Sequence, residues 1–126
     1  MFRNIMQERF NPGTDLTAIA ATDVTGKTFS AYAGPMKSGN ITIATAAAGA
    51  ATAGVIKYDA NTNEFVGVAR GSGRVVTVTT SSELNAGDAV EVAADGTATL
   101  ADTGIIVGWA IDDATAGSDA LISLAH

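Results

Sequence analysis

Short alternations of apolar and polar residues, separated by turn residues, run along most of the chain. They predict strands at Leu16–Ala21, Thr28–Ala33 and Ile41–Ile43, and further strands from Val55 to the end. Turn signals rich in Gly, Asn and Asp recur about every ten residues between these segments. This spacing is typical of a small all-β domain of short antiparallel strands, either a barrel or a sandwich.

The later segments show which residues should share a face. In the segment 75–79, Val76 and Val78 are expected on one side, with Val75, Thr77 and Thr79 on the other. Val90 and Val92 flank Glu91, which is predicted to point outward. The run Ile105–Ile111 is almost continuously apolar and predicts a central strand, and Leu121–Leu124 predicts the last strand.

The segment Ala44–Ala53 is ambiguous, because alanine favours helix but Thr45, Gly49 and Thr52 interrupt it and no apolar stripe appears. We predict a loop or irregular crossover there. Two other stretches, 53–69 and 86–110, look like variations on one unit. Each runs from Ala-Gly through a short alternation and an Asp/Asn/Gly turn to Val-Gly-x-Ala. The pattern predicts a repeated β-hairpin that carries no catalytic chemistry.

Residues 1–15 show no periodicity and contain the turn signal Asn11-Pro12-Gly13. We predict an extended N-terminal arm over 1–15, followed by a single β domain over 16–126. The arm's apolar side chains have no local core to enter, so a partner is expected to cover them; the alternative is a frayed terminus. The candidate contact residues of the arm are Phe2, Arg3, Ile5, Met6, Arg9 and Phe10.

Composition points to stabilisation by association. One domain is expected for 126 residues, but the chain holds only one Trp, two Tyr and four Phe, and it is rich in small side chains. Small side chains bury little apolar area each, at about 25 cal/mol per Å². A lone domain of this kind would be marginal, so self-association or a partner is expected to add stability. Cysteine is absent, which excludes disulfides and Cys-based metal sites.

The charge is unevenly distributed along a chain of net charge −6. All seven Lys and Arg residues lie at or before Arg74, whereas Glu83 to the end holds eight acidic residues and no basic one. Such a surface should repel nucleic acid. It is either a solvated acidic face that aids solubility or one end of a polarised molecule whose other end is docked.

No targeting or membrane segment is apparent. Residues 1–10 lack the apolar run of a signal peptide, and residues 41–56, the most apolar stretch, are too short and too rich in Thr, Ala and Gly to span a membrane. The sequence therefore predicts synthesis in a cytoplasm and no membrane partner. Asn40-Ile41-Thr42 is formally a glycosylation sequon, which has no meaning without a secretory signal.

Two motifs come near to ligand-binding patterns. Residues 59–63 match the opening of a calcium loop, but Glu64 stands where the loop needs Gly and Arg70 where it needs a bidentate Glu, so a hairpin turn is favoured. The segment Arg70–Arg74 could cradle a phosphate but lacks dinucleotide spacing and a Walker lysine. A flexible turn whose exposed Arg70 and Arg74 meet a protein partner's carboxylates is the alternative.

The remaining candidates also favour structural roles. Met36-Lys37 resembles the modified lysine of biotinyl domains only faintly, because Ser38 replaces the second Met. His126 is the only His, which argues against a triad or a His-ligated zinc site, and Asp112-Asp113 is interpreted as a turn. Trp109 is expected to pack in the core, with a subunit interface as the alternative. We therefore expect no enzymatic activity, no cofactor and no metal.

One ordered set of segments covers nearly the whole chain: residues 12–17, 24–26, 38–41, 54–55 with 58–60, 66–76, 86–92 and 107–110. Taken in this order, the segments resemble the head decoration, or capsid cement, proteins of tailed bacteriophages, particularly those of actinobacterial hosts. The ordered set is specific although no single segment is, and residues 1–11 fall outside it.

The resemblance implies a small β-barrel or β-tulip-like domain without catalytic residues. It also implies a homotrimer on the outer surface of the virion head, at three-fold and quasi-three-fold positions, made in the bacterial host cytoplasm. There it would bind the major capsid protein and stabilise its lattice. The alternatives are another β-structured virion component, such as a tail-tube or head–tail connector protein, and a ligand-binding β-sandwich module.

Overall fold

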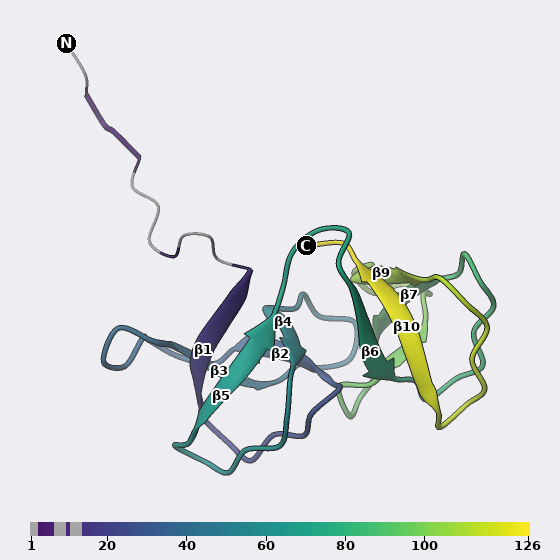
Figure 1. Cartoon of the computed structure of the whole chain (residues 1–126), viewed down its shortest axis with the longest axis horizontal. Coiled ribbons are helices and arrows are strands. Elements are labelled where there is room, and N and C mark those ends of the chain that lie inside the picture. The colour runs from purple at the N-terminus through teal and green to yellow at the C-terminus, as the bar shows by residue number, and fades with distance from the viewer. Residues whose placement is uncertain (1–2, 7–9, 11–13) are drawn as a thin grey trace.

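Ten β-strands make up the described part of the chain, residues 3–6, 10 and 14–126, in the computed structural model (Figure 1). No helix forms in these residues, and so none is available to cross a membrane. The predicted all-β fold is confirmed. The strands are β1 Asp15–Ala20, β2 Phe29–Tyr32, β3 Ile41–Thr45, β4 Gly54–Ile56, β5 Phe65–Ala69, β6 Val75–Thr79, β7 Ala89–Val92, β8 Ala98–Leu100, β9 Gly108–Ala110 and β10 Asp119–Leu124.

The first five strands close into a barrel in the order β1-β3-β2-β4-β5. Strand β1 closes it, because it pairs in parallel with β3 and antiparallel with β5. The two-residue period of β1 turns Leu16, Ala18 and Ala20 inward and leaves Thr17 exposed. These side chains join a barrel core that includes Ile43 and Val68.

The last five strands repeat this topology. Their order is β6-β10-β9-β7-β8, which is the cyclic order of the barrel when β6 takes the place of β1, β7 of β2, β8 of β3, β9 of β4 and β10 of β5. The two units differ in how the first and third strands of each pair to close the sheet. Where β1 and β3 pair over three residues, β6 and β8 are joined in the described structure by one parallel bridge just beyond β6, between Thr80 and Ala98. The chain is thus an internal duplication of one five-stranded unit, and we call its parts the first and second barrel.

Strand registers match between the two barrels. Val55 of β4 lies opposite Ala69 of β5, and Trp109 of β9 lies opposite Ser123 of β10 at the equivalent place. Every other strand pair repeats its register in the same way. The predicted hairpin repeat is therefore wrong in its alignment. The stretch 53–69 is the hairpin β4–β5, whereas 86–110 runs from β7 through β8 to β9.

The turns repeat as well. The backbone N–H of Gly26 donates to Asp59 Oδ1 at 2.8 Å, and the backbone N–H of Ala86 donates to Asp113 Oδ1 at 2.8 Å. Each carboxylate fixes the loop between the first two strands of its barrel to the loop between the last two. The interpretation of Asp112-Asp113 as a structural turn agrees with this geometry.

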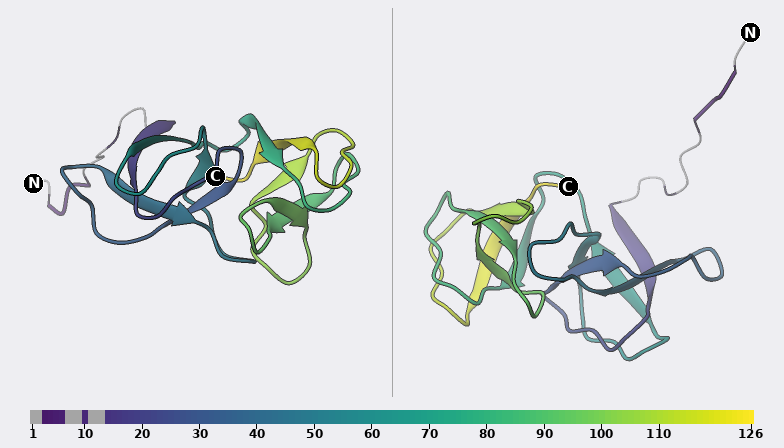
Figure 2. Two further views of the ribbon diagram at one scale, coloured as in Figure 1. Left: turned by 90° about the horizontal axis from the view of Figure 1, so that it is seen from below. Right: turned by 180° about the vertical axis from the view of Figure 1, so that it is seen from behind.

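The two barrels meet at a junction (Figure 2), where residues of the first barrel contribute to the core of the second. The backbone N–H of Thr79 donates to the carbonyl of Lys27 at 2.9 Å, and that of Phe29 donates to the carbonyl of Gly96 at 2.8 Å. The segment 27–29 of the first barrel thereby fills the gap between β6 and β8. The Phe29 side chain is fully buried and belongs to the core of the second barrel, together with Val78 and Ile122. Each barrel keeps its own interior, yet the second is completed by the first.

Most predicted segments agree with the strands. Strands β1, β2 and β3 fall within one or two residues of their predictions, and the expected crossover at Ala44–Ala53 is a loop after the end of β3. The prediction for Ile105–Ile111 is too long, because β9 covers only Gly108–Ala110. Ile105 leaves the sheet to donate its backbone N–H to the carbonyl of Gly49 at 3.0 Å, although β9 does occupy the middle of the sheet order.

Glu91 alternates with the buried Val90 and Val92 as predicted, but loops cover the face of β7 on which it lies. Its side chain is half-buried, and Oε2 is buried without a hydrogen-bond partner in the described structure. The loops around Gly49 and Gly104 cover this side of β7, because a Cβ atom at Gly104 would collide with the Glu91 carboxylate. Val90 and Val92 are buried as predicted.

Candidate interaction surfaces

The described residues of the arm present apolar side chains to solvent. Ile5 is 72% exposed and Met6 is 77% exposed, and Arg3 is also exposed. Residues 3–6 lie well away from both barrels (Figure 1). Phe10 differs from its prediction, because its half-buried ring packs against the core of the first barrel. The candidate contacts Phe2 and Arg9, and the turn signal at 11–13, lie outside the described residues.

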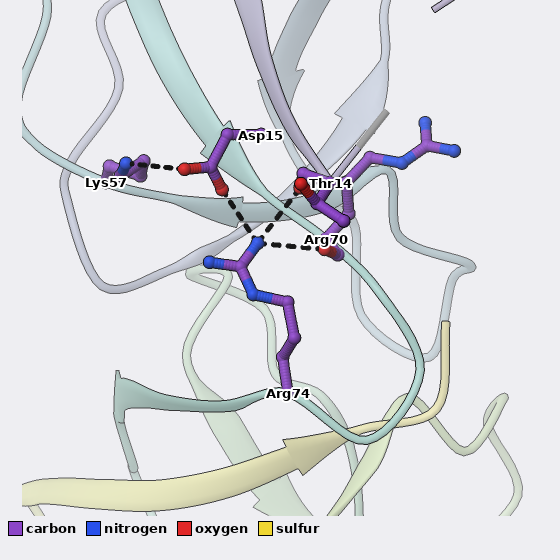
Figure 3. Close-up of polar contacts among 5 residues, drawn as sticks. All are labelled: Thr14, Asp15, Lys57, Arg70 and Arg74. Atoms are coloured by element: carbon purple, nitrogen blue, oxygen red, sulfur yellow. Dashed lines mark hydrogen bonds and ion pairs between the residues drawn. The ribbon is translucent and has the colours of Figure 1, made fainter. Parts of the chain in front are cut away.

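The connection between the barrels, residues 70–74, is held by a network of polar contacts (Figure 3). Arg74 Nη1 donates to Asp15 Oδ1 at 2.7 Å, to the Thr14 carbonyl at 3.0 Å and to the Arg70 carbonyl at 2.9 Å. Lys57 Nζ pairs with the other carboxylate oxygen of Asp15 at 3.0 Å. The pKa of Asp15 lies below its usual value. The hydrogen bond from Arg74 is the largest cause, and the hydrogen bond from Lys57 is the next.

This network shows how the two candidate arginines are engaged. Arg74 braces the connection onto the start of β1, and Arg70 donates to the Tyr32 hydroxyl at 3.2 Å. The phosphate-cradle hypothesis is wrong for this loop. The N–H of Gly71 donates to the His126 carbonyl at 3.0 Å and the N–H of Gly73 to the Leu124 carbonyl at 2.8 Å, so both amides are used within the chain.

A cleft of about 290 Å³ lies where the barrels meet beside this network. Its basic side chains are Lys27, Lys57 and Arg74, above an apolar wall that includes Val55 and Val75. Lys27 pairs with Asp119 of β10 at 3.1 Å, and the other two cations pair with Asp15. The basic half of the chain is thereby tied to the acidic half. The ion pairs of Lys27 and Lys57 could not be predicted from the sequence, because their carboxylate partners are distant along the chain.

The second barrel carries exposed apolar side chains on its outer face. Trp109 is 44% exposed, so the core position expected for it is wrong, while the alternative of an interface remains open. Ile111 is 48% and Leu121 43% exposed nearby. Sequence analysis missed these two as surface residues, although a two-residue period places Ile111 on the side of Trp109.

The acidic residues of the described structure form no group of three or more that could hold a metal ion. Two of the carboxylates instead accept hydrogen bonds that hold loops of the chain. Asp95 Oδ1 accepts from the Thr97 hydroxyl at 2.5 Å, and Asp23 Oδ1 accepts from the Thr62 amide at 2.8 Å. These hydrogen bonds lower the pKa of both carboxyl groups. The residues 59–63, weighed as a calcium loop, form part of the turn between β4 and β5.

Comparison with solved structures shows that the fold is known. The chain is similar to the crystal structure of the head fiber gp8.5 N base in bacteriophage phi29, with a TM-score of 0.74 and 23% sequence identity. The match covers 88% of this chain and 92% of that chain. No family model matches the sequence, and no curated protein matches it. The likeness shows that the duplicated β-barrel fold is shared with the base of a phage head fiber.

Proposed function

We propose that this protein is a virion component of a tailed bacteriophage that binds the outer surface of the head. The fold likeness to a head fiber base, over most of both chains, is the observation that supports it. The resemblance of the ordered sequence segments to phage head decoration proteins points the same way and rests on separate evidence.

The finer proposal is a capsid decoration, or cement, protein. Three copies would sit at three-fold and quasi-three-fold positions and contact neighbouring major capsid subunits, stabilising their lattice. The exposed Ile5 and Met6 of the arm support a contact of this kind, because exposed apolar side chains on an extended segment are costly unless a partner covers them. An extended segment can gain backbone hydrogen bonds by adding to a sheet edge of a neighbouring subunit.

This role is structural, and we propose no catalysis, cofactor or metal for it. Asp59 and Asp113 each accept a hydrogen bond that fixes loops within one barrel, and Asp119 pairs with Lys27 across the two barrels. With a net charge of −6, the protein should bind a protein lattice rather than packaged nucleic acid.

A ligand-binding β-module is the competing proposal from another class, and exposed aromatic side chains keep it open. Tyr32 is 59%, Tyr58 53% and Phe65 61% exposed. They belong to different elements, the end of β2, the loop after β4 and the start of β5. A sugar would be recognised by stacking on such rings.

Co-sedimentation with undecorated heads separates the two proposals. The heads would be assembled from the major capsid protein encoded by the same phage. A decoration protein should pellet with them in a fixed stoichiometry that matches the capsid three-folds and saturates. A ligand-binding module should remain in the supernatant, and that result would contradict the proposed function.

A further inference from the structure

We propose that copies of this chain contact one another through one outer face of the second barrel, named here the Trp109 face. The inference deepens the proposed function, on which it rests for the presence of several copies. It names the surface that joins them. The face is defined by two rows of side chains: Trp109, Ser123 and Val75, and Ile111, Leu121 and Thr77.

Strand register places these side chains together. Ser123 of β10 lies directly opposite Trp109 of β9 on one side and Val75 of β6 on the other. In the second row, Leu121 lies opposite Thr77 and its carbonyl accepts from the backbone N–H of Ile111 at 3.0 Å. Side chains directly opposite on one face are about 5 Å apart at Cβ, so the two rows form one continuous surface.

The first barrel provides an internal comparison, because it has the same strands in the same register. Its row equivalent to Trp109, Ser123 and Val75 contains Val55, Ala69 and Asp15. Val55 and its equivalent Trp109 are both apolar. At the other end of the row, the first barrel has the acidic Asp15 where the second has Val75. The fold itself therefore does not require an apolar residue at this end of the row.

The second row changes more strongly. Its equivalent in the first barrel contains Lys57, Gly67 and Thr17, where the second barrel has Ile111, Leu121 and Thr77. Lys57 and Asp15 form an ion pair across this face at 3.0 Å. The second row is thus polar and solvent-exposed in the first barrel, whereas two of its three residues are large and apolar in the second. Contiguous exposed apolar residues of this kind mark contact sites.

The same position is already an interface within the chain. Val55, the equivalent of Trp109, is 3% exposed because it packs into the core of the second barrel beside Phe29. Trp109 is 44% exposed, so no part of the described structure covers it as the second barrel covers Val55. A neighbouring copy can supply the cover that the second barrel supplies to Val55.

A second copy is the occupant that the charges favour. None of the six side chains of the Trp109 face is ionisable, so two such faces can meet around a rotation axis without burying an unpaired charge. Each copy carries a net charge of −6, so two copies repel at long range, although the cleft lined by Lys27, Lys57 and Arg74 adjoins Val75 and Thr77 of this face. Copies should therefore repel weakly at low salt and associate more tightly as salt screens the acidic halves. A basic partner protein would show the opposite salt dependence.

Sedimentation velocity of the full chain tests the proposal, with Trp109 fluorescence as a local probe because it is the single tryptophan. Leu121→Lys and Thr77→Lys place a cation on the face. Thr17→Lys is the matched control, because Thr17 is exposed and occupies the position in the first barrel equivalent to Thr77. Far-ultraviolet circular dichroism checks that each variant folds.

We expect the wild type to associate between about 1 and 500 μM, with a blue shift of Trp109 emission and tighter association in about 0.5 M NaCl. Leu121→Lys and Thr77→Lys should weaken association about tenfold or more, and Thr17→Lys should leave it unchanged. A wild type that stays monomeric over this range, an unshifted Trp109 emission on association, or an equal effect of Thr17→Lys would overturn the proposal. Binding to heads is measured separately. Loss of head binding with association intact would overturn the proposed function, whereas absence of association with head binding intact would overturn this inference.

Discussion

Arg74, in the connection between the barrels, binds the carboxylate of Asp15 at the start of β1 at 2.7 Å. The same guanidinium also donates to the Thr14 carbonyl just before β1 and to the Arg70 carbonyl just after β5. One side chain therefore fixes where the first strand begins and where the fifth strand leads into the second barrel. The contact is half-exposed, with side chains 36% and 48% exposed, so it orients the connection more than it stabilises the fold.

Asp15→Asn should lower the free energy of unfolding at neutral pH by less than about 1 kcal/mol. The pKa of Asp15 is lowered in the folded protein, so its contribution is present above the unfolded pKa of about 3.9 and is lost as pH falls through the folded pKa. Urea unfolding should thus separate the variant from wild type at pH 7 and bring the two together at about pH 2, where most carboxylates are protonated. Asp102→Asn, on the exposed loop after β8, controls for the loss of one charge. Equal stabilities at pH 7 would contradict the role of the Asp15–Arg74 contact.

Phe29→Ala should destabilise both barrels together by about 3–5 kcal/mol, because the ring is fully buried in the core of the second barrel while its backbone belongs to β2 of the first. Phe65→Ala is the matched control, since Phe65 is 61% exposed. The measurement is denaturant unfolding followed by circular dichroism for both barrels and by Trp109 fluorescence for the second.

Coincident transitions by the two probes would support the prediction that residues 16–126 form one cooperative domain. Separate transitions, with only the Trp109 signal moved by Phe29→Ala, would show that the barrels unfold independently. The shared core and the backbone bonds at Lys27 and Phe29 lead us to expect coincidence.

Gly54→Ala and Gly108→Ala should each destabilise the fold by about 1–3 kcal/mol. These glycines occupy equivalent positions in β4 and β9. A Cβ atom would lie 2.6 Å from the Ala69 carbonyl oxygen in the first case and 2.6 Å from the Ser123 carbonyl oxygen in the second. Gly73→Ala is a control with no atom within 4 Å of the added Cβ, although its φ of +80° carries backbone strain of its own. Thermal unfolding should rank Gly73→Ala as the mildest, and a harmless Gly108→Ala would contradict the equivalence.

Replacing Ile5 and Met6 together by Ser should leave the melting temperature unchanged, because these side chains are 72% and 77% exposed. The same variant should bind undecorated heads more weakly if the arm contacts the capsid. Phe10→Ala is the contrasting change, and it should lower the melting temperature because the ring packs on the first barrel. Unchanged head binding by the Ile5/Met6 variant would show that this part of the arm is a frayed end.

The strand pattern was predictable where side chains alternate strictly. Leu16, Ala18 and Ala20 point inward in β1 as their spacing predicts, and Val90 and Val92 do so in β7. The apolar run Ile105–Ile111 was misread because its outward members, Trp109 and Ile111, lie on an exposed face and look in sequence like core residues. An apolar side chain does not itself reveal whether the chain or a partner covers it.

The alternation of apolar and polar residues could not predict the duplication or the polar network. Trp109 and Val55 are equivalent in structure but unlike in type, so the repeat is visible in strand register and hardly at all in residue identity. The ion pairs of Lys27 and Lys57 join residues far apart in sequence, whose approach depends on barrel closure. The turn hydrogen bonds were hidden as well. Gly26 and Ala86 occupy equivalent positions but differ in type, because each donates through its backbone N–H.

An electron-microscopy map of heads saturated with this protein tests the central claim most directly. The proposed function predicts ordered density on the outer surface at the three-fold and quasi-three-fold positions, with three copies of the two-barrel fold around each axis. It also predicts that the arm reaches the major capsid protein. Heads without added density, or single copies bound away from those axes, would contradict the claim that this chain is a trimeric decoration protein.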